Sequence, residues 1–249
     1  MARASLQRRL SWQVAEVAGA ISETAHVRSL ILDAPGWTSH RAGQHVDIRL
    51  TAEDGYQAVR SYSIASAPAE GKLVVTVERL DDGEVSPYLV DELRAGDKVE
   101  VRGPIGGYFV WEAPLGGPLL LVGGGSGIVP LMAILRQRAA VGSDAAVHLL
   151  ASWRTADDII YAAELERLGQ LEGVEIAHTL TRDAPAGWAG RRGRIDERML
   201  AEVAWPPASP GLSFVCGPTG LVESVATGLV TLGHDPGRIR TERFGPTGG

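Results

Sequence analysis

The feature that most constrains this chain of 249 residues is the stretch 118–136, PLLLVGGGSGIVPLMAILR. Residues 119–122 form a short apolar run, typical of a strand buried on both faces of a parallel sheet. The glycine-rich segment 123–127 allows the backbone to turn tightly and to approach a ligand closely. Residues 128–136 return to helical spacing, with Pro130 in the first turn, where its missing N–H is harmless. This order predicts a strand, a glycine turn and a helix N-terminus, whose N–H groups and positive dipole end suit a phosphate.

The glycine turn departs from two common patterns. The dinucleotide fingerprint needs a third glycine at position 128, where this chain has Ile128. The nucleophile elbow of hydrolases also fails, because Gly127 follows Ser126 directly. A glycine-rich turn that holds no ligand is therefore an open alternative on these residues alone. The glycines, the serine and the flanking prolines argue against a membrane-spanning helix.

Periodicity divides the chain into two domains, at a linker rich in glycine and proline near residues 112–118. Residues 1–113 hold short alternating or apolar segments separated by turn signals, with one helical insert at 87–93, which predicts a closed antiparallel Greek-key β-barrel. Residues 114–249 alternate strands with helices, which predicts a doubly wound parallel α/β domain. The expected strands are 13–17, 27–32, 45–50, 60–64, 72–78, 98–102, 119–122, 146–151, 174–180, 212–216 and 239–241. The expected helices of the second domain are 130–138, 158–168, 196–203 and 221–232.

Charge and cysteine content exclude several classes of function. A formal net charge of −6 argues against nucleic acid as a partner. The single cysteine, Cys216, excludes an internal disulfide and a four-cysteine iron–sulfur cluster, and the histidines show no ligand spacing, so we expect no metal. The basic first ten residues lead into no apolar core, so we expect no signal peptide, no membrane attachment and a reducing cytoplasm as the location.

Two runs in the first domain carry chemistry. In residues 60–66, RSYSIAS, an arginine can bind a phosphate through its planar fork, a tyrosine can stack, and a serine can reach a ring nitrogen. Residues 83–89, GEVSPYL, form a glycine turn before a helix that Ser86 can cap, which suits a second phosphate. Either run alone is compatible with ordinary strand and cap sequence. Their order ahead of the glycine turn favours a shared ligand.

Taken together, these motifs resemble the ferredoxin–NADP⁺ reductase-like flavoproteins, and within them the oxygenase-reductase type. The likeness covers nearly the whole chain, and the motifs occur in the family's order. Residues 60–63 are similar to the family's flavin motif and 83–86 to its flavin-pyrophosphate motif. Residues 123–130 are similar to its nicotinamide-nucleotide loop and 216–218 to the motif beside the nicotinamide. The resemblance implies a flavin-binding barrel, residues 1–113, followed by an NAD(P)H-binding domain, residues 114–249.

The resemblance implies a role for each matching residue. Arg60 would pair with the flavin phosphate, Tyr62 would pack on the isoalloxazine ring, and Ser63 would hydrogen-bond near its N5 atom. Cys216 would lie beside the nicotinamide, and Glu242 would be the family's C-terminal acid, so the implied catalytic residues are Ser63, Cys216 and Glu242. The implied cofactor-binding residues are Arg60, Ser61, Tyr62, Ser63, Val77, Gly83, Val85, Ser86, Gly124, Gly125, Ser126, Gly127, Pro130, Arg154, Thr181, Arg182, Arg191, Cys216, Gly217, Pro218 and Phe244.

The C-terminus departs from the plant-type members of the family, which end on a tyrosine. This chain continues past Phe244 through the glycine-rich residues 245–249, for which we expect a mobile tail. Phe244 is then either a lid over the flavin or a residue that closes the core. Cys216 likewise has an alternative, as a small buried residue ending a strand.

The choice of nucleotide depends on the residues that follow the second and third strands of the second domain. An NAD site usually places an acid about 20 residues beyond the glycine turn, at the end of the second strand. Here that strand leads to Arg154, and the third strand leads to Thr181 and Arg182, with Arg191 further on. In the family a hydroxyl–arginine pair at this place holds the 2′-phosphate, so the resemblance favours NADPH over NADH. Arginines that only line a loop or bind the pyrophosphate are the alternative.

The function implied is an NAD(P)H-dependent flavoprotein reductase that uses FAD, or less favourably FMN. Because the sequence has neither the cysteines nor the residues for a fused ferredoxin domain, we expect a separate acceptor protein, such as a ferredoxin or an oxygenase component. We expect a monomer. The alternatives are a free-flavin or ferric-chelate reductase, and an accessory subunit that binds flavin without turnover.

Overall fold

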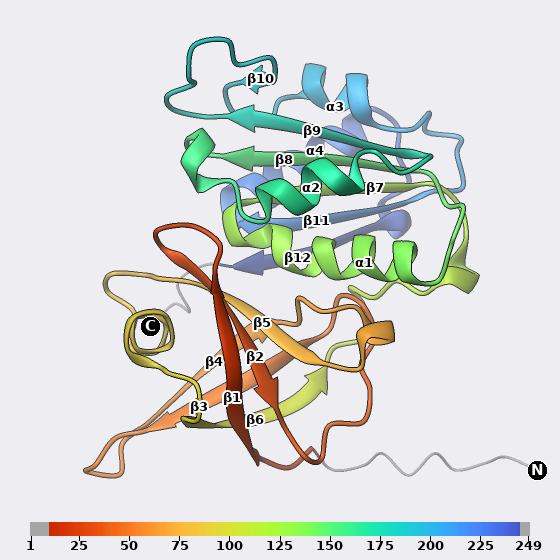
Figure 1. Cartoon of the computed structure of the whole chain (residues 1–249). Helices are drawn as coiled ribbons and strands as arrows, with labels where there is room; N and C mark the ends of the chain where they lie inside the picture. Colours follow the sequence, from red (N-terminus) through yellow and green to blue (C-terminus); the bar gives the residue numbers. More distant parts are fainter. Residues whose placement is uncertain (1–9, 245–249) are drawn as a thin grey trace, which may run out of the picture.

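The computed structural model describes residues 10–244 and arranges them as two stacked domains (Figure 1). The lower domain in Figure 1 is an antiparallel sheet and the upper domain is a parallel sheet covered by helices on both faces. The expected fold class, an antiparallel barrel followed by a doubly wound parallel α/β domain, is confirmed. The chain passes between them through a 3₁₀ turn, Ala113–Leu115, inside the expected linker.

The first domain contains six strands in the order β4-β3-β6-β1-β2-β5, and all neighbours are antiparallel. The sheet curls until its two ends meet at a bridge between Ile64 and Val75. Alternate residues such as Val46, Ile48 and Val101 fill the interior, as period-2 burial requires. The strands are β1 (Gln13–Ser22), β2 (Val27–Asp33), β3 (His45–Thr51), β4 (Gln57–Ser63), β5 (Leu73–Glu78) and β6 (Lys98–Ile105).

Several elements of this domain differ from the sequence prediction: β1 and β6 extend beyond the expected 13–17 and 98–102, and β4 and the helical insert also differ. Strand β4 begins at Gln57 and ends at Ser63, because Gln57 to Ser63 pair continuously with β3. The helical insert is a single π-type turn, η2 (Tyr88–Glu92), which packs Leu89 into the barrel core. A second short turn, η1 (Pro68–Glu70), connects β4 to β5.

The second domain has a parallel sheet in the order β10-β9-β8-β7-β11-β12. Its central strands are buried on both faces, as their continuous apolar runs predict. The strands are β7 (Leu119–Gly124), β8 (Val147–Trp153), β9 (Val174–Leu180), β10 (Arg191–Arg192), β11 (Leu212–Pro218) and β12 (Ile239–Phe244). The helices are α1 (Ile128–Ala140), α2 (Ala162–Leu168), α3 (Glu197–Val203) and α4 (Thr219–Thr231), with 3₁₀ turns η4 (Gly125–Gly127), η5 (Ala156–Asp158) and η6 (Pro236–Arg238).

Helix α2 is shorter than predicted. The segment expected to begin it folds as η5, in which Asp158 accepts hydrogen bonds from the backbone and hydroxyl of Thr155. Tyr161 then adopts φ = +61°, a left-handed conformation that interrupts helical geometry. The helix therefore begins only at Ala162. The two-residue strand β10 was not predicted, because so short a strand leaves no periodicity.

The strand order creates a switch point between β7 and β11, from which the chain winds outward in both directions. Ligands of open α/β sheets bind in the crevice outside the carboxyl ends of the strands at such a point. The glycine turn and the start of α1 lie at this place, and α1 is the helix nearest the barrel (Figure 1). Among the described residues, no helix has the length and apolar character needed to span a membrane.

Candidate functional site

The glycine turn lies against the end of strand β11. A Cβ atom on Gly127 would stand 2.2 Å from the carbonyl oxygen of Cys216, so only glycine fits there. Gly127 itself has φ = −61°, which any residue can adopt, so the close approach alone requires a glycine. Cys216 is fully buried and pairs in register with Gly123 on one side and Glu242 on the other. The two motifs that the sequence analysis assigned to the nicotinamide nucleotide, 123–130 and 216–218, therefore lie side by side.

The N–H groups of the turn can bind an anion. The N–H of Ser126 donates to the carboxylate of Glu78, at the end of β5, across 3.3 Å. This carboxylate comes from the barrel and is the kind of group that a helix N-terminus attracts. An anionic phosphate would compete with this carboxylate for the N–H of Ser126, and the sequence analysis did not identify Glu78 as a neighbour of the turn.

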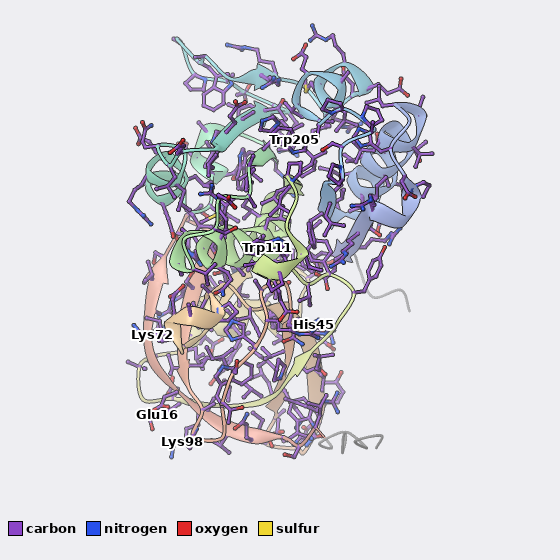
Figure 2. All side chains as sticks on the ribbon, turned by 90° about the vertical axis from the view of Figure 1, so that its right-hand side faces the viewer. Glu16, His45, Lys72, Lys98, Trp111 and Trp205 are labelled. Atoms are coloured by element: carbon purple, nitrogen blue, oxygen red, sulfur yellow. The ribbon has the colours of Figure 1, made fainter. Side chains whose placement is uncertain are left out.

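The flavin motif and the C-terminal acid converge on His45. Ser63, the last residue of β4, pairs in register with His45, and His45 Nδ1 lies 3.8 Å from Glu242 Oε1. Figure 2 shows His45 near the junction of the two domains, whereas Glu16 and Lys98 lie at the far end of the barrel. His45 was also missed by the sequence analysis, because a histidine beginning a strand carries no signal by itself. Its importance comes from the contact with the second domain.

Two polar atoms of this group have no partner. Four buried side-chain polar atoms in the described part of the chain lack a hydrogen bond, and two of them are Ser63 Oγ and Glu242 Oε2. Buried polar atoms are normally satisfied, so an unpaired atom needs an explanation such as a missing ligand. An unpaired hydroxyl at the flavin motif and an unpaired carboxyl oxygen on Glu242 beside Cys216 fit the polar edges of a flavin and a nicotinamide.

Burial sets the protonation of the site. It raises the pKa of the Glu242 carboxyl to about 7 and lowers the pKa of His45, against the opposing influence of Asp47. Near neutral pH the contact between these two side chains is therefore not a full ion pair. Burial, and then the nearby Glu242, raise the pKa of the Cys216 thiol, so this cysteine stays neutral and is not a nucleophile. Burial likewise raises the pKa of the Tyr62 phenol, which keeps that ring uncharged.

The expected phosphate site of the flavin joins both barrel motifs. Arg60 on β4 donates to the carboxylate of Glu84, which belongs to the glycine turn 83–86. Gly83 has little room, because an added Cβ would stand 2.8 Å from Ser86 Oγ. Ser86 does not cap η2 as predicted. Its hydroxyl accepts a hydrogen bond from the N–H of Leu80 instead, which leaves its own proton free to bind a phosphate.

We expect Arg60→Ala to weaken flavin binding roughly 10- to 100-fold, because a charge-assisted hydrogen bond contributes about 1.5–3 kcal/mol. The pair with Glu84 should not prevent phosphate binding: the two side chains are 38% and 49% exposed, and a surface pair contributes at most about 1 kcal/mol. The measurement is the flavin dissociation constant from fluorescence titration of the apoprotein. Arg49→Ala, which removes an arginine paired with Glu100 elsewhere on the barrel, is the matched control. Equal flavin affinity in wild type and Arg60→Ala would remove Arg60 from the site.

The predicted 2′-phosphate residues are only partly available. Arg154 and Arg182 follow β8 and β9, are exposed, and lie next to each other through a backbone hydrogen bond. The hydroxyl of Thr181 already donates to the carbonyl of Trp153, and Arg191 pairs with Glu202 of α3. Arg154 and Arg182 are thus better placed for a phosphate than the other two.

The remaining predicted residues take supporting positions. Val77 and Val85 are buried in the barrel core, so only their backbone atoms could contact a cofactor. The hydroxyl of Ser61 donates to Asp47 and is not free. Phe244 pairs in register with Pro218 and packs half-buried against the apolar cluster that continues from the second domain into the barrel; the tail 245–249 lies outside the described residues. Within residues 10–244 no three His, Cys, Asp or Glu side chains are grouped as metal ligands.

Comparisons with known proteins agree with this arrangement. Residues 16–110 match the oxidoreductase FAD-binding domain family, and residues 121–227 match the oxidoreductase NAD-binding domain family. The flavohem-like FAD/NAD-binding domain of nitric oxide dioxygenase from Vibrio cholerae superposes with a TM-score of 0.84 at 28% identity, over 94% of this chain and 99% of that one.

Two curated relatives are reductase components. The glycine betaine monooxygenase reductase subunit of Chromohalobacter salexigens is 33% identical over 91% of this chain and 62% of its own length. The ferredoxin–NAD(P)⁺ reductase component of the naphthalene 1,2-dioxygenase/salicylate 5-hydroxylase systems of a Ralstonia species is 28% identical, over 92% of this chain and 68% of its own length. This chain thus spans less than two thirds of the first of these relatives. With its FAD-binding barrel, its NAD-binding domain and the meeting of their motifs at one junction, the chain belongs to the ferredoxin–NADP⁺ reductase-like flavoproteins.

Proposed function

We propose that this protein is an NAD(P)H-dependent reductase that passes electrons from a nicotinamide nucleotide through FAD to a separate redox protein. The observation that carries the proposal is the convergence of Ser63, His45 and Glu242, since it brings the flavin motif of the barrel to the nucleotide-binding end of the second domain. Hydride transfer needs both rings held in contact, and a junction of this kind provides the place. Two things support the proposed activity: this geometry, and the similarity to relatives that are named as reductase components. Both relatives are longer than this chain.

Each residue would contribute binding, orientation or a proton. When bound, FAD supplies the redox chemistry, taking two electrons and a proton as a hydride and giving the electrons up singly. Arg60 and the turn 83–86 would hold its phosphates, and the Ser63 hydroxyl would orient the ring by a hydrogen bond. The glycine turn and the start of α1 would hold the nucleotide pyrophosphate. Glu242, whose carboxyl has a pKa of about 7, can keep or release a proton beside the rings at neutral pH.

The proposed acceptor is a ferredoxin or an oxygenase component, by analogy with the relatives' names. The edge of the flavin would be reached from the barrel side of the domain junction. Tyr108 stands there, 61% exposed, and its hydroxyl donates to the carbonyl of Ile239 in the second domain. An electron-transfer partner docking at this face would contact both domains at once.

Anaerobic reduction tests the proposed function directly. The purified protein should be yellow, and addition of NADPH or NADH should bleach its flavin absorbance within the time of a stopped-flow experiment. A yellow protein that neither nucleotide bleaches would be an accessory subunit. A protein that reduces added free flavin or ferric chelates rapidly, but reduces no ferredoxin or oxygenase component, would favour the alternative reductases.

For the nucleotide, we propose a preference for NADPH, supported by Arg154 and Arg182, two exposed residues whose backbones are joined by a hydrogen bond at the ends of β8 and β9. A guanidinium can bind a phosphate through two parallel hydrogen bonds, a bidentate pair. The 2′-phosphate is the only group that distinguishes NADPH from NADH. No acid follows β8 before Asp157, whereas an acid at the strand end is typical of NAD sites.

We expect Arg182→Ala to raise the Michaelis constant for NADPH roughly tenfold and to leave that for NADH nearly unchanged. The reason is the loss of a charged hydrogen bond that only the 2′-phosphate makes, which is worth at least about 1.5 kcal/mol. Arg198→Ala, which removes the same charge from helix α3, is the control. A wild-type protein that prefers NADH, or equal weakening of both nucleotides, would overturn the NADPH preference while leaving the reductase function intact.

A further inference from the structure

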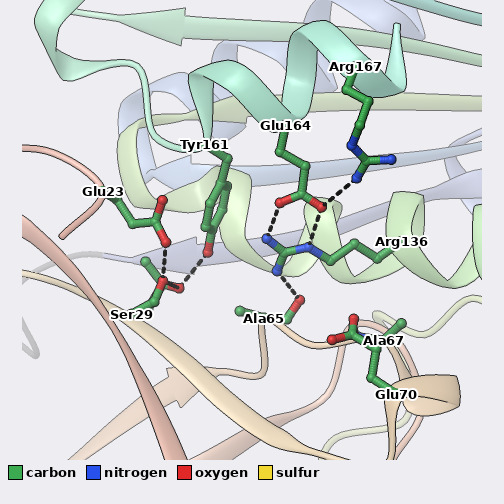
Figure 3. A network of polar contacts seen from close by, with 10 residues as sticks. Glu23, Ser29, Ala65, Ala67, Glu70, Arg136, Tyr161, Glu164 and Arg167 are labelled. Atoms are coloured by element: carbon green, nitrogen blue, oxygen red, sulfur yellow. Dashed lines mark hydrogen bonds and ion pairs between the residues drawn. The ribbon is translucent and has the colours of Figure 1, made fainter. Parts of the chain in front are cut away.

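Figure 3 shows a group of polar contacts that joins the second domain to the barrel on the side of α1 and α2. Its centre is Arg136 of α1. The guanidinium donates to the carbonyl oxygen of Ala65 in the barrel across 2.7 Å, and to the two carboxylate oxygens of Glu164 of α2 across 3.0 and 2.6 Å. The Arg136 side chain is 17% exposed, so these are largely buried contacts. One planar group therefore holds α1, α2 and the barrel together.

A second contact lies beside the first. The hydroxyl of Tyr161 donates to Thr76 of β5, whose own hydroxyl lies 2.7 Å from that of Ser29 on β2. The Arg136 guanidinium lies 4.6 Å from the centre of the Tyr161 ring, which links the two contacts by a cation–π interaction. Tyr161 is the described residue other than glycine that has a positive φ, and this conformation directs it to the barrel. We call Arg136, Tyr161, Glu164, Ala65 and Thr76 the domain clamp.

The clamp is attached to both halves of the candidate site. Ala65 follows Ser63, with its unpaired hydroxyl, by two residues. Helix α1 begins directly after the glycine turn, and Arg136 lies two turns further, about 12 Å along a rigid helix. The bond from Arg136 to Ala65 thus fixes the distance between the segment that would orient the flavin and the turn that would hold the nucleotide.

We propose that Arg136 is a positioning residue for hydride transfer, acting through the domain clamp to set how the nicotinamide meets the flavin. This inference rests on the proposed function. Hydride transfer is sensitive to geometry, and a displacement of about 1 Å caused by a distant residue can slow a reaction up to about 100-fold. A residue that only stabilised the interface would change the melting temperature without a matching change in the transfer rate.

The test is Arg136→Met in the flavin-loaded protein, with NADPH and NADH as the reductants. The rate of flavin reduction at saturating nucleotide should fall tenfold or more, while flavin content and the dissociation constant of the nucleotide change less than twofold. Methionine keeps the apolar stem of the arginine but cannot bind Ala65 or Glu164. A primary isotope effect measured with 4-deuterated nucleotide should increase, because the hydride step becomes more limiting.

Hydrogen exchange gives a readout that does not depend on activity. The amide of Ala69 in η1 donates to the side chain of Gln137 in α1 across 3.1 Å, so it reports on the distance between the domains. This amide should exchange faster in Arg136→Met than in the wild type. Arg167→Met is the matched control: Arg167 pairs with the same carboxylate of Glu164 at 3.5 Å, but it is 67% exposed, and among the described residues it makes no hydrogen bond or ion pair with the barrel. This control should leave both the rate and the exchange unchanged.

A double variant separates position from stability. Arg136→Met leaves Glu164 half-buried without its main partner, and adding Glu164→Leu removes that charge. We expect the melting temperature to recover in the double variant and the transfer rate to remain low. Arg136→Lys, which can reach only one of the two partners at a time, should restore part of the rate and serves if the methionine variant does not fold.

Recovery of the rate together with stability, or a normal rate in Arg136→Met, overturns the inference and leaves the proposed function standing. A wild-type flavin that neither nucleotide reduces overturns the proposed function, and the inference with it. The two failures are therefore distinguished by the wild-type measurement alone.

Discussion

Gly127→Ala should destabilise the second domain by about 3 kcal/mol, the upper end of the usual cost of overpacking, and abolish measurable nucleotide binding. The added methyl group would lie 2.2 and 2.5 Å from the carbonyl oxygen and carbon of Cys216, and 2.7 Å from the Cα of Gly217. All three are backbone atoms, which cannot rotate away as a side chain can. The clash can be relieved only if the turn moves away from β11, and this movement displaces the N–H groups that would bind the phosphate. Chemical denaturation and nucleotide titration measure the two effects.

Gly220→Ala is the matched control for this prediction. Gly220 lies in helix α4 of the same domain and has no atom within 4 Å of an added Cβ. Alanine favours a helix over glycine, so this variant should be unchanged or more stable by up to about 1 kcal/mol. If Gly127→Ala has the same free energy of unfolding and the same nucleotide affinity as the wild type, then the turn does not lie against β11 as described.

Glu242→Gln should remove a pH dependence from the stability of the protein. Burial raises the pKa of this carboxyl from an ordinary 4.5 to about 7, so the folded state binds a proton more tightly than the unfolded state. The wild type therefore loses stability as pH rises from about 4.5 to about 7, and no further loss occurs above that range. A shift of this size corresponds to at most about 3 kcal/mol. The glutamine side chain in Glu242→Gln does not titrate, so the variant should not lose stability in this way as the pH rises.

The measurement is the free energy of unfolding of both proteins at pH 5 and pH 8. The free energy of unfolding of Glu242→Gln, relative to that of the wild type, should be higher at pH 8 than at pH 5 by up to about 3 kcal/mol. Glu223→Gln is the control, because that carboxylate is 57% exposed and pairs on the surface with Arg243, where a pair contributes less than about 1 kcal/mol. If the stability difference between the wild type and Glu242→Gln is the same at both pH values, then burial does not raise the pKa of the Glu242 carboxyl.

Much of the fold could be predicted because it depends on local pattern. Alternation of apolar residues defines strands such as β3, and the apolar run with its glycine turn defines β7 and α1. Boundaries were less accurate where a tertiary contact decides them. Strand β4 is extended by pairing with β3, and α2 is shortened because Tyr161 turns toward the barrel.

The candidate site divides in the same way. The sequence by itself determined the order of the two domains and the motifs predicted to bind phosphate groups. Glycine allows a tight turn, and arginine and serine can donate hydrogen bonds to a phosphate, wherever these residues lie in the fold. Only the tertiary structure decided that Ser86 binds Leu80, that Glu78 reaches the glycine turn, and that His45 meets Glu242. These pairs involve residues brought together by strand register and by the contact between domains. Periodicity records which face of an element is buried, but it does not record what that face is buried against.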